Sequence, residues 1–115
     1  MLFRSDGLTC KIDEAGGLSG APLREKSLEM VRFIGARLRG RLALVGVGGI
    51  SSPQDVLAML AAGASLVQVY TALVYEGPGV VRMLNKGLLS FIEQRGYRSI
   101  SEAAAAWGEE QRRVA

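Results

Sequence analysis

One stretch of the sequence decides the fold: residues 42–52 read Leu-Ala-Leu-Val-Gly-Val-Gly-Gly-Ile-Ser-Ser. The first six residues are almost wholly apolar, a pattern typical of a parallel strand that is covered on both faces. Beyond the glycines, Ser52 can cap a helix that has Pro53 at its first position and Asp55 three residues after the cap. The stretch therefore predicts a buried strand that turns sharply into a helix.

Segments of helical and strand periodicity alternate on both sides of this stretch, and glycine clusters separate them. The second predicted strand covers residues 65–71 and places Val67 and Val69 on one face. A strand, a helix and a second strand within about thirty residues form a βαβ unit, which gives a parallel sheet. The predicted helices span residues 27–39, 53–62, 81–95 and 101–107.

The number of strands is too small for a complete α/β domain. A strand as apolar as residues 42–47 needs neighbours on both edges, and the sequence offers one convincing partner. A complete (β/α)8 barrel takes roughly 250 residues, whereas this chain has 115. We therefore expect an α/β chain that is the C-terminal fragment of a TIM barrel, with about two parallel strands and flanking helices.

Composition excludes several classes of function. The chain has no His, which removes the Ser-His and Cys-His dyads and nearly every transition-metal site. Its net charge of +3 is too small and too scattered to indicate a nucleic-acid surface. Cys10 is the single cysteine, and no apolar run approaches the length of a membrane-spanning helix. We predict no metal site, no nucleic-acid partner and a cytoplasmic location.

The glycine-rich turn at residues 46–50 is the first candidate site. It leads from a strand into a helix, where free backbone N–H groups favour an anion such as phosphate. A side chain at Gly48 or Gly49 would hold a phosphate away from the main chain, and tight turns often need positive φ. A strand-to-helix turn without any ligand explains the same residues equally well. A dinucleotide fingerprint fails, since Ser51 takes the place of its third glycine and no acidic residue lies between Ala58 and Ala72.

Two further segments are candidates for the same anion-binding site. The cluster at residues 16–20 precedes a helical pattern and has the flexibility to fold around a cofactor, although a plain turn explains it as well. Tyr70 and Thr71 close the second predicted strand. They would lie at the carboxyl edge of the sheet, where barrel enzymes have their sites.

Together these segments resemble the C-terminal third of dihydroorotate dehydrogenase, an FMN-containing (β/α) barrel. The resemblance spans residues 16–98. It rests on the runs Gly16-Gly17-Leu18-Ser19-Gly20-Ala21-Pro22-Leu23, Val45 to Ser52, and Ala62 to Leu73. Pro22-Leu23 and the tyrosine at position 70 point to the quinone-dependent branch.

The resemblance implies a cofactor and a set of contacts. FMN would bind through its phosphate, with Gly20, Gly48, Gly49, Tyr70 and Thr71 forming the cradle. In this family the flavin oxidises dihydroorotate to orotate in pyrimidine (UMP) biosynthesis and passes the electrons to a quinone. Residues 1–15 do not follow the family pattern, and residues 99–115 are expected to form a helical tail.

The resemblance assigns no catalytic residue to this chain. In the family, the serine base, the substrate-binding residues and the helices that dock on the membrane all precede the segment matched by Gly16. We therefore expect this chain alone to be inactive and any peripheral membrane contact to come from such a preceding region. Two alternatives stay open: the phosphate-binding segment of another TIM-barrel enzyme, and a non-catalytic domain that self-associates or binds an anionic partner through the arginines Arg24, Arg32, Arg37, Arg39 and Arg41.

Overall fold

The computed structural model describes residues 19–114, so Gly16, Gly17 and Leu18 lie outside the described residues. A short 3-10 turn, Ala21–Leu23, leads into the first of five α-helices in this part of the chain. The helices are α1 Arg24–Leu38, α2 Pro53–Ala62, α3 Thr71–Glu76, α4 Gly79–Arg95 and α5 Ile100–Val114. The strands are β1 Val45–Val47 and β2 Leu66–Gln68.

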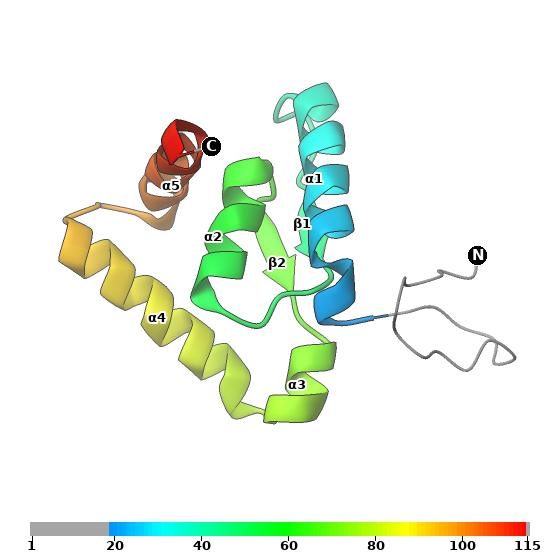
Figure 1. Cartoon of the computed structure of the whole chain (residues 1–115). Coiled ribbons are helices and arrows are strands. Elements are labelled where there is room, and N and C mark those ends of the chain that lie inside the picture. Colours follow the sequence, from blue (N-terminus) through cyan, green and yellow to red (C-terminus); the bar gives the residue numbers. More distant parts are fainter. Residues whose placement is uncertain (1–18, 115) are drawn as a thin grey trace, which may run out of the picture.

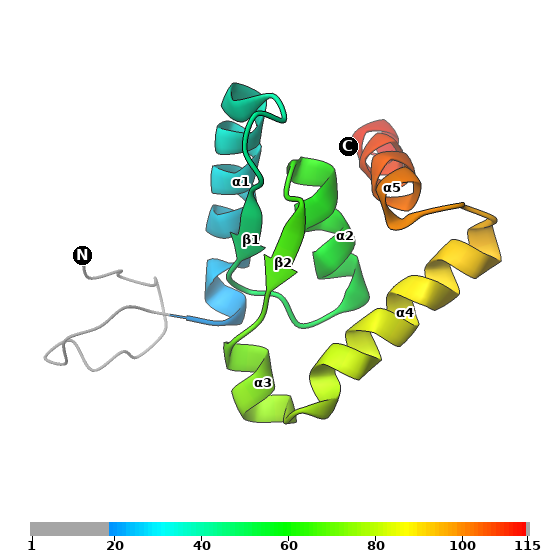
Figure 2. The same cartoon turned by 180° about the vertical axis from the view of Figure 1, so that it is seen from behind.

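The two strands form the predicted parallel pair. Val45 lies opposite Leu66, and Val47 lies opposite Gln68. Helices α1 and α2 cover one face of this sheet, which Figure 1 shows from the helix side and Figure 2 from the strand side. The described residues thus contain a βαβ unit with an additional helix, and they form no closed barrel.

Helix α2 begins where the sequence predicts. The Ser52 hydroxyl accepts a hydrogen bond from the Asp55 amide at 3.2 Å, and the Asp55 carboxylate accepts one from the Ser52 amide at 3.0 Å. This reciprocal pair is the predicted capping box, with Pro53 at the first helical position. The helix ends at Gly63, which has a φ of 123°.

The core lies between the sheet and the helices. Val31 of α1, Met59 of α2 and Leu84 of α4 belong to one buried cluster, whose other members are Ile50, Val56, Ala64 and Val80. Helix α5 packs against α2 through small residues, since a Cβ added at Gly108 would lie 3.2 Å from the Cβ of Ala61. Helix α4 crosses between α3 and α5 (Figure 2).

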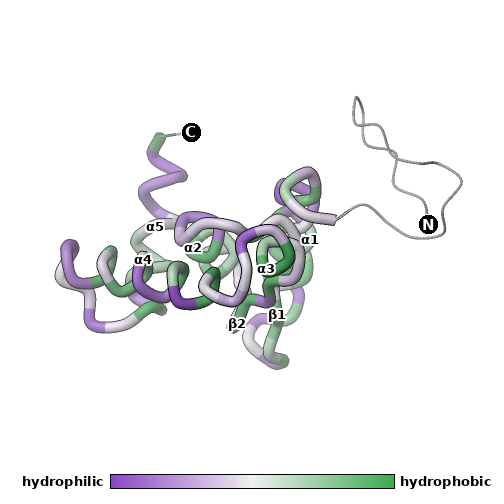
Figure 3. The backbone as a smooth tube through the Cα atoms, turned by 90° about the horizontal axis from the view of Figure 1, so that it is seen from below, coloured by the Kyte–Doolittle hydropathy of each residue, from purple (hydrophilic) through white to green (hydrophobic). Residues whose placement is uncertain are grey.

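The opposite face of the sheet is open, which corrects one prediction. Residues 42–47 were expected to be buried on both faces, yet Val45 is 46% exposed and Val47 is 50% exposed. Gly46 alone is buried in β1, because it points toward Met59 of α2. No other described element lies over this face, and Figure 3 shows that the chain around β1 is nevertheless hydrophobic. The predicted alternation in the second strand is confirmed, since Leu66 is exposed and Val67 is half-buried.

Several element boundaries differ from the sequence prediction. Both strands have 3 residues, because pairing stops where β1 ends at Val47. Past that point the chain has no ladder partner, and Thr71, the last residue of the predicted strand, begins helix α3, which the sequence analysis did not predict. Helix α5 continues through Gly108 to Val114, because helix-forming residues with Arg112 and Arg113 in the last turn follow the glycine.

Helix α1 was predicted to end at residue 39 and ends at Leu38. Arg39, with a φ of 49°, is the left-handed cap, and Gly40 follows with a φ of 76°. The side chain of Arg41 compensates the helix end, since it donates to the carbonyls of Arg37 and Leu38 at 3.2 Å each. These bonds satisfy carbonyls that have no partner within the helix.

Two methionines provide a matched test of this core. Met59 is 2% exposed, whereas Met83 on α4 is 40% exposed. We expect Met59→Ala to lower the free energy of unfolding by about 2–5 kcal/mol, because it leaves a cavity beneath the sheet. Met83→Ala should change it by less than about 1 kcal/mol. Urea unfolding followed by circular dichroism measures both, and equal losses would contradict this description of the core.

Candidate functional site

A hollow of about 780 Å³ lies at the carboxyl ends of the two strands. Its lining comes from three segments: residues 19–27 before and within α1, residues 47–51 after β1, and residues 68–76 around the start of α3. All the residues predicted from the sequence to bind a cofactor line it, namely Gly20, Gly48, Gly49, Tyr70 and Thr71. Segments far apart in the sequence therefore meet where the prediction requires.

The turn after β1 owes its shape to its two glycines. Gly48 has a φ of +108° and Gly49 a φ of +75°, values that side-chain-bearing residues rarely adopt. A Cβ at Gly48 would collide with the Ser27 hydroxyl, and one at Gly49 would lie 2.6 Å from the Cα of Arg24. The positive φ values confirm one of the two reasons given for these glycines. The structure adds a third reason, because the missing side chains make room for α1. Close approach of a phosphate stays a prediction.

The first and third segments touch each other directly. The Thr71 hydroxyl donates to the Ser19 hydroxyl at 3.1 Å. A Cβ added at Gly20, whose φ is 86°, would lie 3.0 Å from Cγ2 of Thr71. The start of the described chain and the start of α3 are thus in contact at one wall of the hollow.

Three backbone donors around the hollow, one from each segment, have no partner within the part of the chain that the structure describes. The amide N–H groups of Gly20, Gly49 and Thr71 donate to no other described residue. A phosphomonoester needs several such donors, since backbone amides and hydroxyls are its common ligands at loop and helix starts. The residues present therefore fit a phosphate group, which the resemblance predicts to be that of FMN.

The tyrosines at the site are open to solvent. Tyr70 is 71% exposed and is the residue before α3, rather than part of a strand that continues to Thr71 as predicted. Tyr75, which the sequence analysis did not select, is 84% exposed and also lines the hollow. Tyr75 lies on α3, so its place in the lining depends on a helix that the sequence pattern did not predict.

A pair of charged side chains behind the turn was also missed as part of the site. Arg24 Nε donates to the carbonyl of Gly49 at 3.0 Å and lies 3.1 Å from Oδ1 of Asp55. The other carboxylate oxygen of Asp55 accepts from the amides of Ser51 and Ser52. Sequence analysis had assigned Asp55 to the capping box alone and Arg24 to a possible basic surface. The sequence signal that could have pointed to Arg24 is its position at the start of the helix that follows the glycine cluster at residues 16–20.

The remaining chemistry of the described residues is limited. Among the residues that line the hollow, Glu76 is the only Asp, Glu, Lys or Arg. No group of His, Cys, Asp and Glu residues within residues 19–114 could hold a metal ion. In the same range, no helix is both long and apolar enough to span a membrane.

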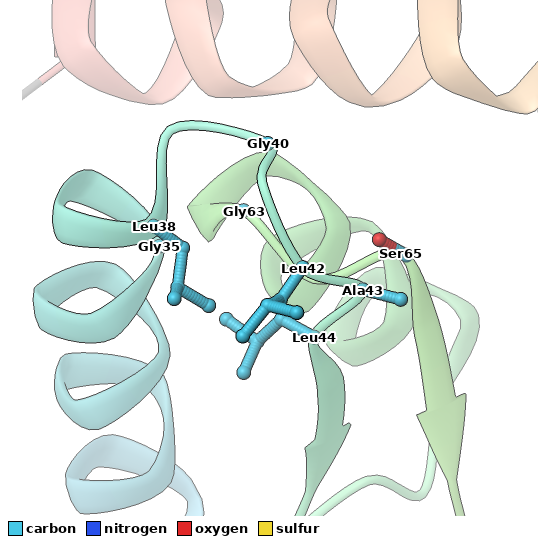
Figure 4. A pocket seen from close by; sticks show the side chains of 8 residues that line it. All are labelled: Gly35, Leu38, Gly40, Leu42, Ala43, Leu44, Gly63 and Ser65. Carbon is cyan, nitrogen blue, oxygen red and sulfur yellow. The ribbon is translucent and has the colours of Figure 1, made fainter.

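A second hollow, of about 250 Å³, lies at the amino ends of the strands. Figure 4 shows Leu38, Leu42 and Leu44 projecting from two sides of it, with Gly35 and Gly63 where α1 and α2 approach each other. A Cβ at Gly35 would lie 3.1 Å from the carbonyl oxygen of Ala62. This hollow contains none of the predicted site residues.

Comparison with known proteins identifies the family. Residues 5–92 match the family model described as dihydroorotate dehydrogenase. The chain belongs to the dihydroorotate dehydrogenase family. The matched range begins within residues 1–15, which the sequence analysis had placed outside the resemblance.

Relatives of this dihydroorotate dehydrogenase chain are known in several organisms. The dihydroorotate dehydrogenase (quinone) of Nostoc punctiforme is 49% identical over 110 residues, which cover 88% of this chain and 29% of the relative. The enzyme of the same name from Deinococcus radiodurans is 50% identical over 90 residues, covering 78% of this chain and 24% of the relative. The chain thus spans less than a third of the length of these curated relatives.

Solved structures agree with the family and with the barrel origin of the fold. The ligand-free DHODH of Eimeria tenella superimposes with a TM-score of 0.78 at 35% identity, over 90% of this chain and 29% of that one. The same organism's DHODH in complex with ferulenol gives a TM-score of 0.72 at 37% identity, over 80% of this chain and 24% of that one. The described unit is therefore part of a TIM-barrel enzyme fold.

Two glycines with nearly equal φ separate the cost of backbone strain from the cost of close packing. Gly96 has a φ of +72° and no atom within 4 Å of an added Cβ, whereas Gly49 has a φ of +75° and faces the backbone of Arg24. We expect Gly96→Ala to lower the free energy of unfolding by about 1–2 kcal/mol. Gly49→Ala should cost about 1–3 kcal/mol more, because α1 must move away from the turn. Urea unfolding of both variants checks this, and equal losses would show that α1 does not constrain the turn.

Proposed function

We propose that this chain forms the FMN-phosphate-binding part of a quinone-dependent dihydroorotate dehydrogenase. The observation that carries the proposal is the meeting of Gly20, Gly49 and Thr71, from three separate segments, around one hollow with their amide N–H groups unpaired among described residues. Barrel enzymes commonly bind phosphate at this place, in the loops after the last two strands and at a short extra helix. In this chain β1, β2 and α3 would supply those features.

The residues of this chain would hold and orient the cofactor. The amides of Gly20, Gly49 and Thr71 would donate to the phosphate oxygens, and the Thr71 hydroxyl would add a further donor. These donors are uncharged, and Glu76 is the only charged side chain in the part of the lining that the structure describes. Tyr70 and Tyr75 would limit access of water to the phosphate from the exposed side of the hollow.

The reaction of the whole enzyme follows from the names of its relatives. Those relatives are called dihydroorotate dehydrogenase (quinone), and we extend to this protein the oxidation of dihydroorotate to orotate for pyrimidine biosynthesis, with a quinone as acceptor. FMN, when bound, supplies the two-electron exchange between these partners. This chain contributes position rather than proton transfer, and we expect it to be inactive on its own, as phosphate contacts neither accept nor abstract a proton.

The chain itself can test the phosphate assignment. Titrating the ¹⁵N-labelled 115-residue protein with FMN should shift the amide signals of Gly20, Gly49 and Thr71 in the NMR spectrum. Riboflavin, which lacks only the phosphate, should bind at least about tenfold more weakly, because charge-assisted bonds contribute about 1.5–3 kcal/mol each. Equal binding of the two flavins, or shifts confined to other residues, would contradict the proposal.

One observation favours self-association as a second property of the chain. The open face of the sheet carries the directly paired Val45 and Leu66, which are 46% and 65% exposed. Apolar strands with uncovered faces and edges promote association between chains.

Because the open face promotes association between chains, we expect the apparent mass of the wild-type protein to rise with its concentration. In light scattering, the double variant Val45→Lys/Leu66→Lys should reduce the apparent mass toward that of a monomer. The matched control Val81→Lys/Leu89→Lys changes residues of α4 that are 47% and 55% exposed and should leave association unchanged. A monomeric wild-type chain at high concentration would overturn this second candidate.

A further inference from the structure

Arg24 and Asp55 form a charge pair that stands behind the phosphate hollow without lining it. Asp55 is well covered, with 11% of its side chain exposed, and Arg24 is partly open at 45%. Their nearest atoms are 3.1 Å apart. The pair joins the first turn of α1 to the first turn of α2, and so it links the elements that follow the two glycine-rich segments.

The contacts of this pair determine which way the turn faces. Arg24 Nε binds the Gly49 carbonyl at 3.0 Å, and Arg24 Nη2 donates to the Ser51 hydroxyl at 3.2 Å. In a trans peptide the carbonyl and the following N–H point in opposite directions. Fixing the Gly49 carbonyl on Arg24 therefore directs the Ile50 amide away from α1.

Asp55 divides the amides of the turn into two groups. Its Oδ2 accepts from the Ser51 amide at 3.1 Å and from the Ser52 amide at 3.0 Å. The Gly49 amide, two residues earlier, donates to no described residue. Asp55 thus uses the donors nearest to α2 and leaves the Gly49 amide for a ligand.

The same carboxylate creates an electrostatic problem that Arg24 removes. Ser51 lines the hollow, and its amide is hydrogen-bonded to Asp55, so a negative charge lies one hydrogen bond behind a lining residue. An uncompensated carboxylate there would repel a phosphate. Arg24 is the only cationic side chain paired with Asp55 in the described residues.

We propose that Arg24 is a positioning residue for the phosphate: it fixes the Gly48–Ile50 turn and neutralises Asp55, so that the turn accepts an anion. This inference rests on the proposed function. Both parts of this role act on the phosphate group, so losing Arg24 should weaken FMN binding and leave riboflavin binding nearly unchanged. The dependence of FMN affinity on the charge of residue 55 and on salt separates charge compensation from positioning of the turn.

The test compares flavins in the full 115-residue chain. Arg24→Met should reduce FMN affinity at least about tenfold and leave riboflavin affinity within about twofold. Arg95→Met is the matched control, because Arg95 forms the exposed pair with Glu110 at 3.6 Å and is 49% exposed. It should leave the affinity for both flavins unchanged.

A second substitution separates charge from structure. Adding Asp55→Asn to Arg24→Met removes the uncompensated charge and keeps an acceptor for one amide, so part of the lost FMN affinity should return. At a salt concentration of about 1 M the Debye length is about 3 Å. The difference in FMN affinity between Arg24→Met and wild type should therefore be smaller at that salt concentration. A double variant that binds FMN more weakly than Arg24→Met would overturn charge compensation.

A ligand-free measurement and a conservative variant complete the design. In Arg24→Met the NMR amide signal of Ile50 should shift, while the signal of buried Met59 stays in place and reports that the core is intact. Arg24→Lys keeps the cation, so it should retain FMN affinity within about threefold of wild type even if Arg24→Met does not fold.

The outcomes distinguish the two proposals. Wild type that prefers FMN, with an Arg24→Met variant that keeps the full preference or an Arg24→Lys variant that loses it, would overturn the role of Arg24 and leave the phosphate site standing. Wild type that binds both flavins equally would overturn the phosphate site and the role of Arg24 together.

Discussion

The close approach of α1 to the turn after β1 is the constraint on which the rest of the structure depends. The backbone of Arg24 leaves no room for a side chain at Gly49, and the Ser27 hydroxyl leaves none at Gly48. This contact sets the positive φ angles of the turn and brings the residues before α1 beside the start of α3. The hollow at the carboxyl ends of the strands is the result, because its three walls come from the three segments that this packing draws together.

The position of the hollow explains why so much of the site was visible in the sequence. Glycine clusters, a capping box and a strand that ends in Tyr70-Thr71 are local patterns, and each marks the carboxyl end of a strand or the start of a helix. Parallel strands bring such ends together. The topology alone therefore places Gly20, Gly49 and Thr71 at the carboxyl edge of the sheet. What local patterns could not show was the pairing of Arg24 with Asp55, which joins residues 31 positions apart and requires α1 and α2 to be packed already.

The errors in the fold prediction share a physical origin. Burial on both faces was inferred for residues 42–47 from their apolar character, but burial depends on neighbours, and the described chain covers one face only. The second strand was predicted to reach Thr71, but pairing stops where β1 ends, and the short helix α3 that begins at Thr71 was missed. The last helix was predicted to end at residue 107, whereas α5 continues through Gly108, which permits close contact with Ala61.

The chain belongs to the dihydroorotate dehydrogenase family, and our proposal is that its main chain holds the phosphate of FMN. The most direct test is a crystal structure of the protein with FMN bound. The account predicts phosphate oxygens within about 2.7–3.2 Å of the amide nitrogens of Gly20, Gly49 and Thr71 at the same time. A phosphate bound elsewhere, or held by one of these three segments without the other two, would contradict it.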